Sequence, residues 1–393
     1  MGADGQRDRL GVSPYHEGPS VMILIDATPL QSEHRVRGVG TYVYYLTREL
    51  TRLAGPSCAF FVAAQDQRLL PEWVAPVHAV YRPHRPAQVY WLYNEWAIRQ
   101  VVKKSHPQIF HATDFNGLVS LRDVPVVATL HDLTGLQTQT RHGNLSQRLS
   151  AWRWRTYYYE KLPTAAHVIA ISEQVKQDAI VKLGLDAQKI SVIPHGVDTD
   201  SLSPRHKGHG LYGNHPPYLL YLGSAEPHKN LPRLLEAFRL VASDYPDLSL
   251  YLGGRWQQRE QAGLDKIIDD LKLRDRVKIL GYVHPEDKPS LLANATAFVF
   301  VSTAEGFGLP ILEAMASGVP VVASDIPVFR EIATDAALFV SPKDVAHLAK
   351  GLQQIVADQS LRDDFARRGL RNIESLTWHS VAVKTWAVYH ERY

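Results

Sequence analysis

Several features that mark other classes of protein are scarce in this sequence. Its 393 residues include one cysteine, Cys58, so no intramolecular disulfide can form and nothing requires an oxidising compartment. The longest apolar runs, such as Val21 to Ile25, are far shorter than the roughly 20 residues of a membrane-spanning helix. The net charge is only +3, which is too small for general affinity for nucleic acid. We therefore expect a cytoplasmic protein with no nucleic-acid partner.

Length and composition favour two soluble domains. The chain is about twice as long as one compact domain. Its 45% apolar and 21% charged residues are close to the average of soluble globular proteins. Residues 1–20 are polar and lack the apolar segment of a signal peptide, so we expect a disordered leader there.

Apolar, β-branched segments alternate with segments of helical periodicity after residue 20. This alternation is typical of parallel strands joined by crossover helices. We predict two doubly wound, Rossmann-like α/β domains that face one another across a cleft. The predicted strands of the first domain (21–200) are Val21–Ile25, Cys58–Ala63, His78–Tyr81, Ile109–His111, Val126–Leu130, His167–Ile171 and Ser191–Ile193. Those of the second domain (218–376) are Tyr218–Leu222, Leu248–Leu252, Val277–Leu280, Ala297–Val301, Val319–Ala323 and Ala337–Val340. Residues 201–217 are the expected linker, and a helix over 377–393 is expected to cross back to the first domain.

Ligands of open α/β sheets bind beyond the carboxyl ends of the strands, and the segment after the strand Ala297–Val301 carries the strongest signal there. Glu305 precedes the turn Gly306-Phe307-Gly308, and Pro310 suits the first turn of a helix. The free amides of a helix start, with glycines that let the backbone approach a ligand, favour a phosphate group. Glu313 is expected in the first helical turn, where its carboxylate can accept hydrogen bonds from vicinal hydroxyls such as those of a ribose.

The string from Glu305 to Ala323, with glutamates eight positions apart, resembles the donor-site signature of family 4 of the retaining glycosyltransferases, which have the GT-B fold. The resemblance extends over essentially the whole chain from Val21 onward. It implies a nucleotide diphosphate sugar as donor, with no metal ion or other cofactor. The amides from Gly306 to Leu309 would hold the diphosphate, Glu305 the sugar and Glu313 the ribose.

The segment YLGSAEPHKN, residues 221–230, supports the same site. Gly223 permits a tight turn after a strand, and Lys229 before a helix can place an ammonium group against a diphosphate. The family usually pairs this lysine with an arginine, and the sequence has Ser224 and His228 at the two positions where that arginine occurs. His228 is either a second cation or a histidine that is neutral at pH 7.

Shorter signals predict the other walls of the site. Gly38 and Gly40 precede a predicted helix and resemble the family's glycine loop near the donor phosphate and the acceptor; an ordinary helix-entry turn is the alternative. His131 follows a strand where the family often has a histidine that hydrogen-bonds the transferred sugar; a histidine satisfied by local backbone is the alternative. The resemblance also places Tyr282 or Val283 beside the nucleobase.

A metal site at Asp198 and Asp200 is set aside. The sequence HGVDTD that contains them follows a strand and resembles the family's interdomain loop, and family members generally need no metal. No other metal-ligand spacing, nucleophile elbow or P-loop occurs in the sequence. We expect no metal ion.

Positive charge is concentrated between Arg68 and Arg155, which contain 11 basic and 5 acidic residues interleaved with tryptophans. The segment from Arg148 to Leu162 is either a helix at a membrane interface or a set of core aromatics with solvated arginines. The first interpretation predicts peripheral contact with an anionic membrane at the inner face of the plasma membrane.

The resemblance favours a retaining hexosyltransferase, with mannose from GDP-mannose as the first choice of sugar. The acceptor would be a glycan or a polyprenyl-linked sugar in the synthesis of a surface polysaccharide such as lipopolysaccharide. Catalysis would rest on positioning by His131, Lys229 and Glu305. Three alternatives remain open: a UDP-sugar-dependent glucosyl- or N-acetylglucosaminyltransferase of the same fold, a nucleotide-sugar epimerase, and a non-enzymatic two-domain solute-binding protein.

Overall fold

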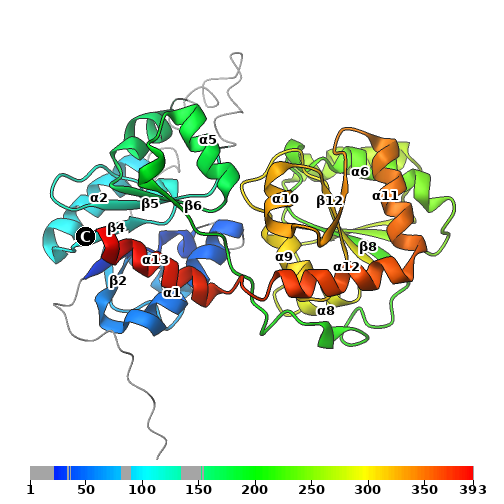
Figure 1. Cartoon of the computed structure of the whole chain (residues 1–393), viewed down its shortest axis with the longest axis horizontal. Helices are drawn as coiled ribbons and strands as arrows, with labels where there is room; N and C mark the ends of the chain where they lie inside the picture. The colour runs from blue at the N-terminus through cyan, green and yellow to red at the C-terminus, as the bar shows by residue number, and fades with distance from the viewer. Residues whose placement is uncertain are drawn as a thin grey trace, which may run out of the picture.

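Two parallel β-sheets form the centres of two domains that lie side by side (Figure 1). The computed structural model describes residues 22–32, 35, 37–80, 90–133, 152 and 155–392. Within these residues the first sheet has the strand order β3-β2-β1-β4-β5-β6-β7 and the second has the order β10-β9-β8-β11-β12-β13. Both orders, with parallel pairing throughout, are those of doubly wound domains. The predicted fold class is confirmed.

Every predicted strand overlaps an observed one, and the ends differ by at most two residues. The first sheet contains β1 (Ile23–Asp26), β2 (Cys58–Ala63), β3 (Val77–Val80), β4 (Ile109–Ala112), β5 (Val126–Leu130), β6 (His167–Ala170) and β7 (Ile190–Val192). The second contains β8 (Tyr218–Leu222), β9 (Ser249–Gly253), β10 (Val277–Gly281), β11 (Ala297–Phe300), β12 (Val321–Ser324) and β13 (Ala337–Val340).

Helices cover both faces of each sheet, which explains why β2 and β11 are buried along their whole length. The helices of the first domain are α1 (Gly38–Ala54), α2 (Tyr90–Ser105) and α5 (Glu173–Leu183). Those of the second are α6 (Leu231–Ala242), α7 (Gln258–Asp270), α8 (Lys288–Ala293), α9 (Leu309–Ala316), α10 (Pro327–Ala333), α11 (Val345–Ala357) and α12 (Gln359–Asn372). In α1 the apolar stripe of Val43, Leu46 and Leu50 is fully buried.

The start of α1 differs from the prediction. Gly38 and Gly40 do not precede the helix but lie in its first turn, after the extended residue Arg37. The helix begins early because neither glycine has a left-handed backbone conformation that would stop it.

The chain passes between the domains twice, at neighbouring places. After β7 it crosses to the second domain, and after α12 it returns. Val197 on the outward segment and Thr377 on the returning one form a parallel β-bridge, and the Val197 N–H donates to Leu376 O at 2.9 Å. The last helix, α13 (Trp378–Arg392), then packs against α1 of the first domain (Figure 1).

Some predicted features lie outside the described residues. These are the leader over 1–20 and most of the aromatic and basic segment from Arg148 to Trp154. Among the residues that are described, no helix is both long and apolar enough to cross a membrane.

Candidate active site

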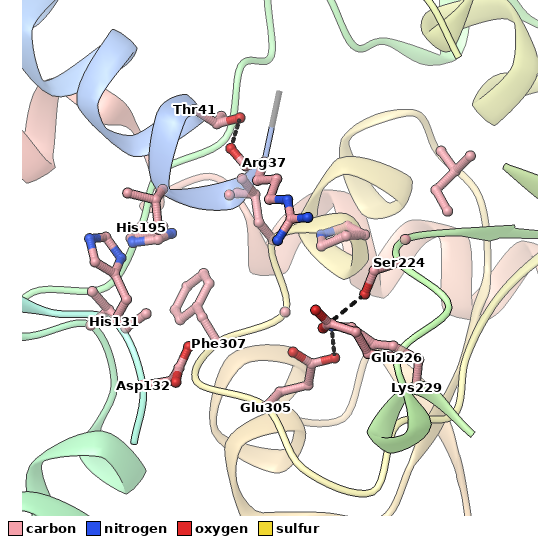
Figure 2. A pocket seen from close by; sticks show the side chains of 18 of the residues that line it. Arg37, Thr41, His131, Asp132, His195, Ser224, Glu226, Lys229, Glu305 and Phe307 are labelled. Carbon is pink, nitrogen blue, oxygen red and sulfur yellow. Dashed lines mark hydrogen bonds and ion pairs between the residues drawn. The ribbon is translucent and has the colours of Figure 1, made fainter. Parts of the chain in front are cut away.

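A cavity of about 880 Å³ lies between the two domains, at the carboxyl ends of their strands. The first domain contributes His131 and Asp132, which directly follow β5, and the second contributes Glu305 and Phe307, which follow β11 (Figure 2). The volume is within the range of small-molecule sites. Most of the predicted site residues from both domains line this single cavity: His131, Gly38, Ser224, His228, Lys229, Tyr282, Val283, Glu305, Phe307, Gly308, Leu309 and Glu313.

Lys229 and Glu305 form an ion pair on the second-domain wall. The Lys229 ammonium donates to Glu305 Oε1 at 2.6 Å, and the Ser302 hydroxyl donates to the same oxygen at 2.7 Å. Both charged side chains are largely buried, with 14% and 12% of their area exposed. Charge-assisted bonds of this kind are strong when water is excluded, so the pair fixes both groups at the cavity wall.

Backbone contacts hold the Lys229 turn against the end of β11. The Thr303 N–H donates to His228 O at 2.7 Å, and the buried Asn230 amide donates to Val301 O at 3.0 Å. Asn230 has a left-handed φ of 63°, which ends the turn at residues 227–229 and begins α6. The two second-domain loops of the site are therefore one rigid unit.

The N-terminus of α9 is the candidate phosphate site. Gly308 is its first flanking residue, with a φ of +120° that only glycine adopts easily, and Pro310 occupies the first turn. No side chain caps this end, and Gly308, Leu309 and Pro310 line the cavity. An uncapped helix start with its positive dipole end favours an anion there.

Two predicted glycines do not line the cavity. Gly40 is buried within α1, and Gly306 lies where the two domains touch. A Cβ atom on Gly306 would be 2.0 Å from His131 O, so this position requires glycine for close approach of the domains. The role of the Gly306 amide in holding the diphosphate stays a prediction.

Glu313 lines the cavity, but in the second turn of α9 and not in the first, because the helix begins at Leu309. Its Oε1 atom is paired with the ammonium of Lys288, at the start of α8. Lys288 also lines the cavity, and it belongs to no motif that the sequence analysis identified.

His195 lines the cavity, although the sequence predicts it only as part of the interdomain loop HGVDTD. Its ring stacks on Tyr42 with centroids 5.1 Å apart, and lies 4.8 Å from the Phe307 ring and 5.8 Å from that of His131. Complete burial, with a smaller contribution from His131, lowers the pKa of His195 well below its ordinary value. The ring is therefore neutral at pH 7.

The other two histidines of the site have defined surroundings. The His131 ring nitrogen Nε2 lies 2.9 Å from Thr113 O, which can only accept, so Nε2 carries the proton. Burial, followed by the charge of Lys229, lowers the pKa of His228. These surroundings favour the neutral alternative for His228 and disfavour a second cation.

Other cationic side chains from both domains line the cavity beside Lys229. They are Arg37, before α1, and Arg255 and Lys288 in the second domain. Among the described residues there is no group of three His, Cys, Asp or Glu that could hold a metal ion. Asp198 accepts a hydrogen bond from Tyr45 at 2.7 Å and belongs to the contact between the crossing segment and α1.

The geometry defines a class: two Rossmann-like domains with a cavity between them that cationic and carboxylate side chains line, as in GT-B glycosyltransferases. Two family patterns match, described as "Glycosyltransferase Family 4" over residues 36–201 and "Glycosyl transferases group 1" over residues 206–371. The chain belongs to family 4 of the glycosyltransferases, with the GT-B fold.

Similar proteins with curated functions include several mannosyltransferases. O-antigen chain mannosyltransferase B of Escherichia coli is 38% identical over 176 residues, which are 44% of this chain and 45% of that protein. O-antigen chain mannosyltransferase RfbU of Salmonella typhimurium is 30% identical over 65% of this chain and 67% of its own length. Phosphatidyl-myo-inositol mannosyltransferase of Mycobacterium leprae is 31% identical over 67% of each chain. The matched region thus spans about half to two thirds of these relatives.

Solved structures share the whole architecture. Sucrose-phosphate synthase of Thermosynechococcus elongatus has a TM-score of 0.76 and 20% identity, and the match covers 94% of this chain and 98% of that one. HepE of Anabaena, solved with UDP and glucose, has a TM-score of 0.73 and 20% identity over 94% of this chain and 100% of its own. At this level of identity the likeness shows the fold.

Proposed function

We propose that this enzyme transfers mannose from GDP-mannose to a glycan or lipid-linked acceptor, with retention at the anomeric carbon. The mannose assignment is supported by the names of the three relatives. The observation that carries the transfer itself is the cavity in which Lys229, Glu305 and the uncapped start of α9 lie together at the carboxyl ends of the second-domain strands. The matched families describe glycosyltransferases, which disfavours the epimerase and solute-binding alternatives.

Donor binding would break the ion pair between Lys229 and Glu305 and give each side chain a new partner on the donor. A diphosphate at the start of α9 attracts the Lys229 ammonium, which then stabilises the charge that grows on the leaving phosphate. Glu305, released from the lysine, accepts hydrogen bonds from sugar hydroxyls. Ser302 keeps the Glu305 carboxylate in place through the bond to Oε1.

Glu313 and Lys288 would bind the remaining polar groups of the donor. The Glu313 carboxylate suits the two ribose hydroxyls, and Lys288 beside it suits a phosphate oxygen. Tyr282, which is 40% exposed, and Val283 form the cavity wall that we assign to the nucleobase.

The chemical step needs no protein nucleophile. The bond from the anomeric carbon to the phosphate oxygen breaks, the acceptor oxygen bonds to the same face of that carbon, and the acceptor proton passes to the leaving phosphate. His131, held by Thr113 O at the first-domain wall, would hold the transferred sugar. Catalysis is then orientation and charge stabilisation.

We further propose that the reaction needs no metal ion, because Lys229, Lys288, Arg37 and Arg255 line the cavity and can supply positive charge to a diphosphate. Full turnover should persist in excess EDTA. Loss of activity with EDTA that magnesium or manganese restores would contradict this proposal.

A donor panel tests the function. Purified enzyme is incubated with GDP-mannose, UDP-glucose, UDP-N-acetylglucosamine or ADP-glucose, and release of the nucleotide diphosphate and protection against thermal unfolding are measured. We expect both effects with GDP-mannose and an α-linked product by NMR. A preference for UDP-glucose would change the assigned sugar from mannose to glucose and would leave the transferase assignment unchanged. No nucleotide release from any donor, with folded protein, would contradict the transferase.

We also propose peripheral contact with an anionic membrane through the first domain. Trp96 on α2, Trp152 and Tyr159 are 52%, 54% and 45% exposed. An ion pair between Lys161 and Glu95 holds the segment that contains Tyr159 beside α2. Exposed aromatic rings suit the headgroup layer, and nearby basic residues such as Arg99 and Arg155 suit anionic lipid.

A further inference from the structure

The N-terminus of α5, in the first domain, is capped by a side chain of the second domain. Glu331 on α10 accepts hydrogen bonds from the backbone N–H groups of Glu173, at 2.7 Å to Oε1, and of Gln174, at 3.3 Å to Oε2. These are the first two residues of α5, whose N–H groups have no partner within the helix. The next N–H group, of Val175, is satisfied by Ser172 Oγ at 3.1 Å.

The same corner of α5 also holds the donor loop of the second domain. Ser172, which is fully buried, donates its hydroxyl proton to Gly306 O at 2.8 Å. Gly306 lies next to Glu305, and its lack of a Cβ atom lets it approach His131 O. The carboxylate of Glu331 and the loop at residues 305–307 therefore contact the first domain at one place.

These contacts lie where the domains would separate. In Figure 1, α5 and α10 face each other across the gap between the domains, away from the two crossing segments. The crossing segments are joined by the bridge between Val197 and Thr377 and are the natural hinge. Because the bonds of Glu331 and the bond from Ser172 to Gly306 O join the two domains, opening about that hinge would break them.

Glu331 lines neither the donor cavity nor the smaller cavity beside α5. It therefore has no contact with substrate and can act only through the position of the domains. A carboxylate at a helix N-terminus gains from both the free N–H groups and the helix dipole. In this protein Glu331 can form these bonds only when the domains are closed, so the stabilisation belongs to the closed arrangement alone.

We propose that Glu331 is a positioning residue: it is an interdomain latch that stabilises the closed arrangement and keeps the Glu305–Phe307 loop against β5 of the first domain. The latch raises the population of the donor-binding arrangement. Apparent donor affinity is reduced by the fraction of molecules that are open, and a saturating donor that contacts both domains restores closure. Loss of the latch should thus raise the donor KM and leave kcat nearly unchanged.

The kinetic test uses Glu331→Ala, Glu331→Gln and the control Asp325→Asn. Asp325 is an exposed carboxylate near the start of α10 that pairs with Arg330 of its own domain, so Asp325→Asn removes the same charge without touching the first domain. We expect the donor KM to rise about tenfold in Glu331→Ala, less in Glu331→Gln, which keeps one acceptor oxygen, and not at all in Asp325→Asn. The kcat values should stay within about twofold of the parent enzyme.

A distance measurement tests closure independently of the proposed transferase activity, on which only the kinetic arm rests. Cys58 is fully buried, so spin labels can be directed to Lys103→Cys on α2 and Lys350→Cys on α11, both at exposed positions. In the presence of Glu331 we expect one narrow distance distribution by electron double resonance. Glu331→Ala should broaden it toward longer distances, and Asp325→Asn should leave it unchanged.

Two results would overturn the latch. One is an unchanged distance distribution in Glu331→Ala, in which case the capping bonds do not control closure. The other is a fall in kcat at unchanged KM, which would assign Glu331 a role in the chemical step. If Glu331→Ala does not fold, the same two readouts on Glu331→Gln decide the question.

Discussion

The ammonium of Lys229 lies 2.6 Å from Glu305 Oε1, and both groups are on the cavity wall next to the start of α9. The pair means that a diphosphate must compete with a carboxylate for the lysine. The competition favours a ligand that offers phosphate to Lys229 and hydroxyl groups to Glu305 at the same time. A nucleotide diphosphate sugar offers both, and free phosphate offers one.

Lys229→Ala should cost about 2–4 kcal/mol of transition-state stabilisation, the scale of one donor lost from a preorganised anion site. The variant also leaves Glu305 beside the diphosphate without a counter-charge. We expect kcat/KM for the donor to fall by roughly 30- to 900-fold, and the thermal midpoint to fall as well, because Glu305 loses its partner at a largely buried position. Lys350→Ala, on exposed α11, is the control. Lys229→Arg should not restore activity, because the larger, planar guanidinium does not reproduce the position from which the compact ammonium donates to Glu305 Oε1.

Glu313→Ala should reduce donor affinity far more than stability. The carboxylate loses its bonds to the ribose, and hydrogen bonds to a charged group are worth about 1.5–3 kcal/mol. We expect the donor Kd to rise by roughly one to two orders of magnitude in calorimetry. The free energy of unfolding should change by less than about 1 kcal/mol, because Lys288 is partly exposed and can be solvated. A donor Kd within twofold of the parent value would mean that Glu313 does not contact the donor.

His228→Arg tests the protonation state of His228. Burial and Lys229 lower the pKa of this histidine, so the site contains a neutral ring at pH 7. An arginine would place a permanent charge beside Lys229, and we expect lower activity at pH 7 and above. His228→Asn keeps a neutral polar side chain and should retain more activity than His228→Arg. The reverse order, with arginine more active above pH 7, would show that the site needs a second cation.

Stability should fall in mild acid because of buried neutral histidines. Burial lowers the pKa of His111 from 6.5 to about 3, and the ring bonds Tyr389 and Thr129. Because the unfolded chain binds a proton near pH 6.5 and the folded chain does not, stability is complete above pH 6.5 and decreases as pH falls toward 3. The loss is about 1.4 kcal/mol per pH unit for each such group. Urea unfolding at pH 7 and pH 5 measures it.

His111→Gln is the variant for that measurement. It should be less stable than the parent at pH 7, since it loses the bonds to Tyr389 and Thr129, and its stability should change less between pH 7 and pH 5. His209→Gln, at an exposed position, is the control and should keep the parent slope. An equal slope in all three proteins would mean that His111 is protonated in the folded state.

Vesicle sedimentation tests the membrane contact. The protein should co-sediment with vesicles that contain anionic lipid and not with neutral ones, and salt should release it as the Debye length shortens. Replacing Arg148, Arg153 and Arg155 by glutamine should weaken that binding without changing donor affinity. Trp96→Ala should weaken it as well, because the exposed ring is lost. If sedimentation does not depend on lipid charge or salt, the membrane contact is wrong and these residues form an ordinary solvated surface.

The fold was predictable because strands that are buried on both faces of a sheet are apolar at nearly every position in the sequence. A strand such as β2 is apolar along its whole length, so its position can be read without knowing its neighbours. The predicted ends of the helices were less accurate than the predicted positions of the strands. Gly38 was expected outside α1, and Glu313 one turn nearer the start of α9, because the first helical turn depends on contacts that local sequence does not specify.

The site was predictable where its residues directly follow a strand. His131 and Glu305 were found by that rule. His195 follows Pro194 after β7 and obeys the same rule, but its neighbouring aspartates drew attention to a metal site instead. Arg255, two positions after β9, also obeys the rule and was overlooked. Lys288 carried no such signal, because it lies seven positions after the end of β10 and reaches the cavity wall only through the folding of the second domain. The capping of α5 by Glu331 was equally hidden, since 157 or more positions separate the partners in the sequence.

The packing of α13 against α1 makes the first domain discontinuous along the chain. Tyr389 is buried in that domain, and the Trp378 ring stacks on Tyr45 at 5.1 Å. A fragment that stops after β7 would lack this cover and expose part of its core to water. A second-domain fragment that retains α13 would carry an apolar helix with nothing to pack against. Each half can be prepared alone only if residues 378–392 are moved to the first, so in this enzyme the unit that folds and the unit that binds the donor do not share the same boundaries.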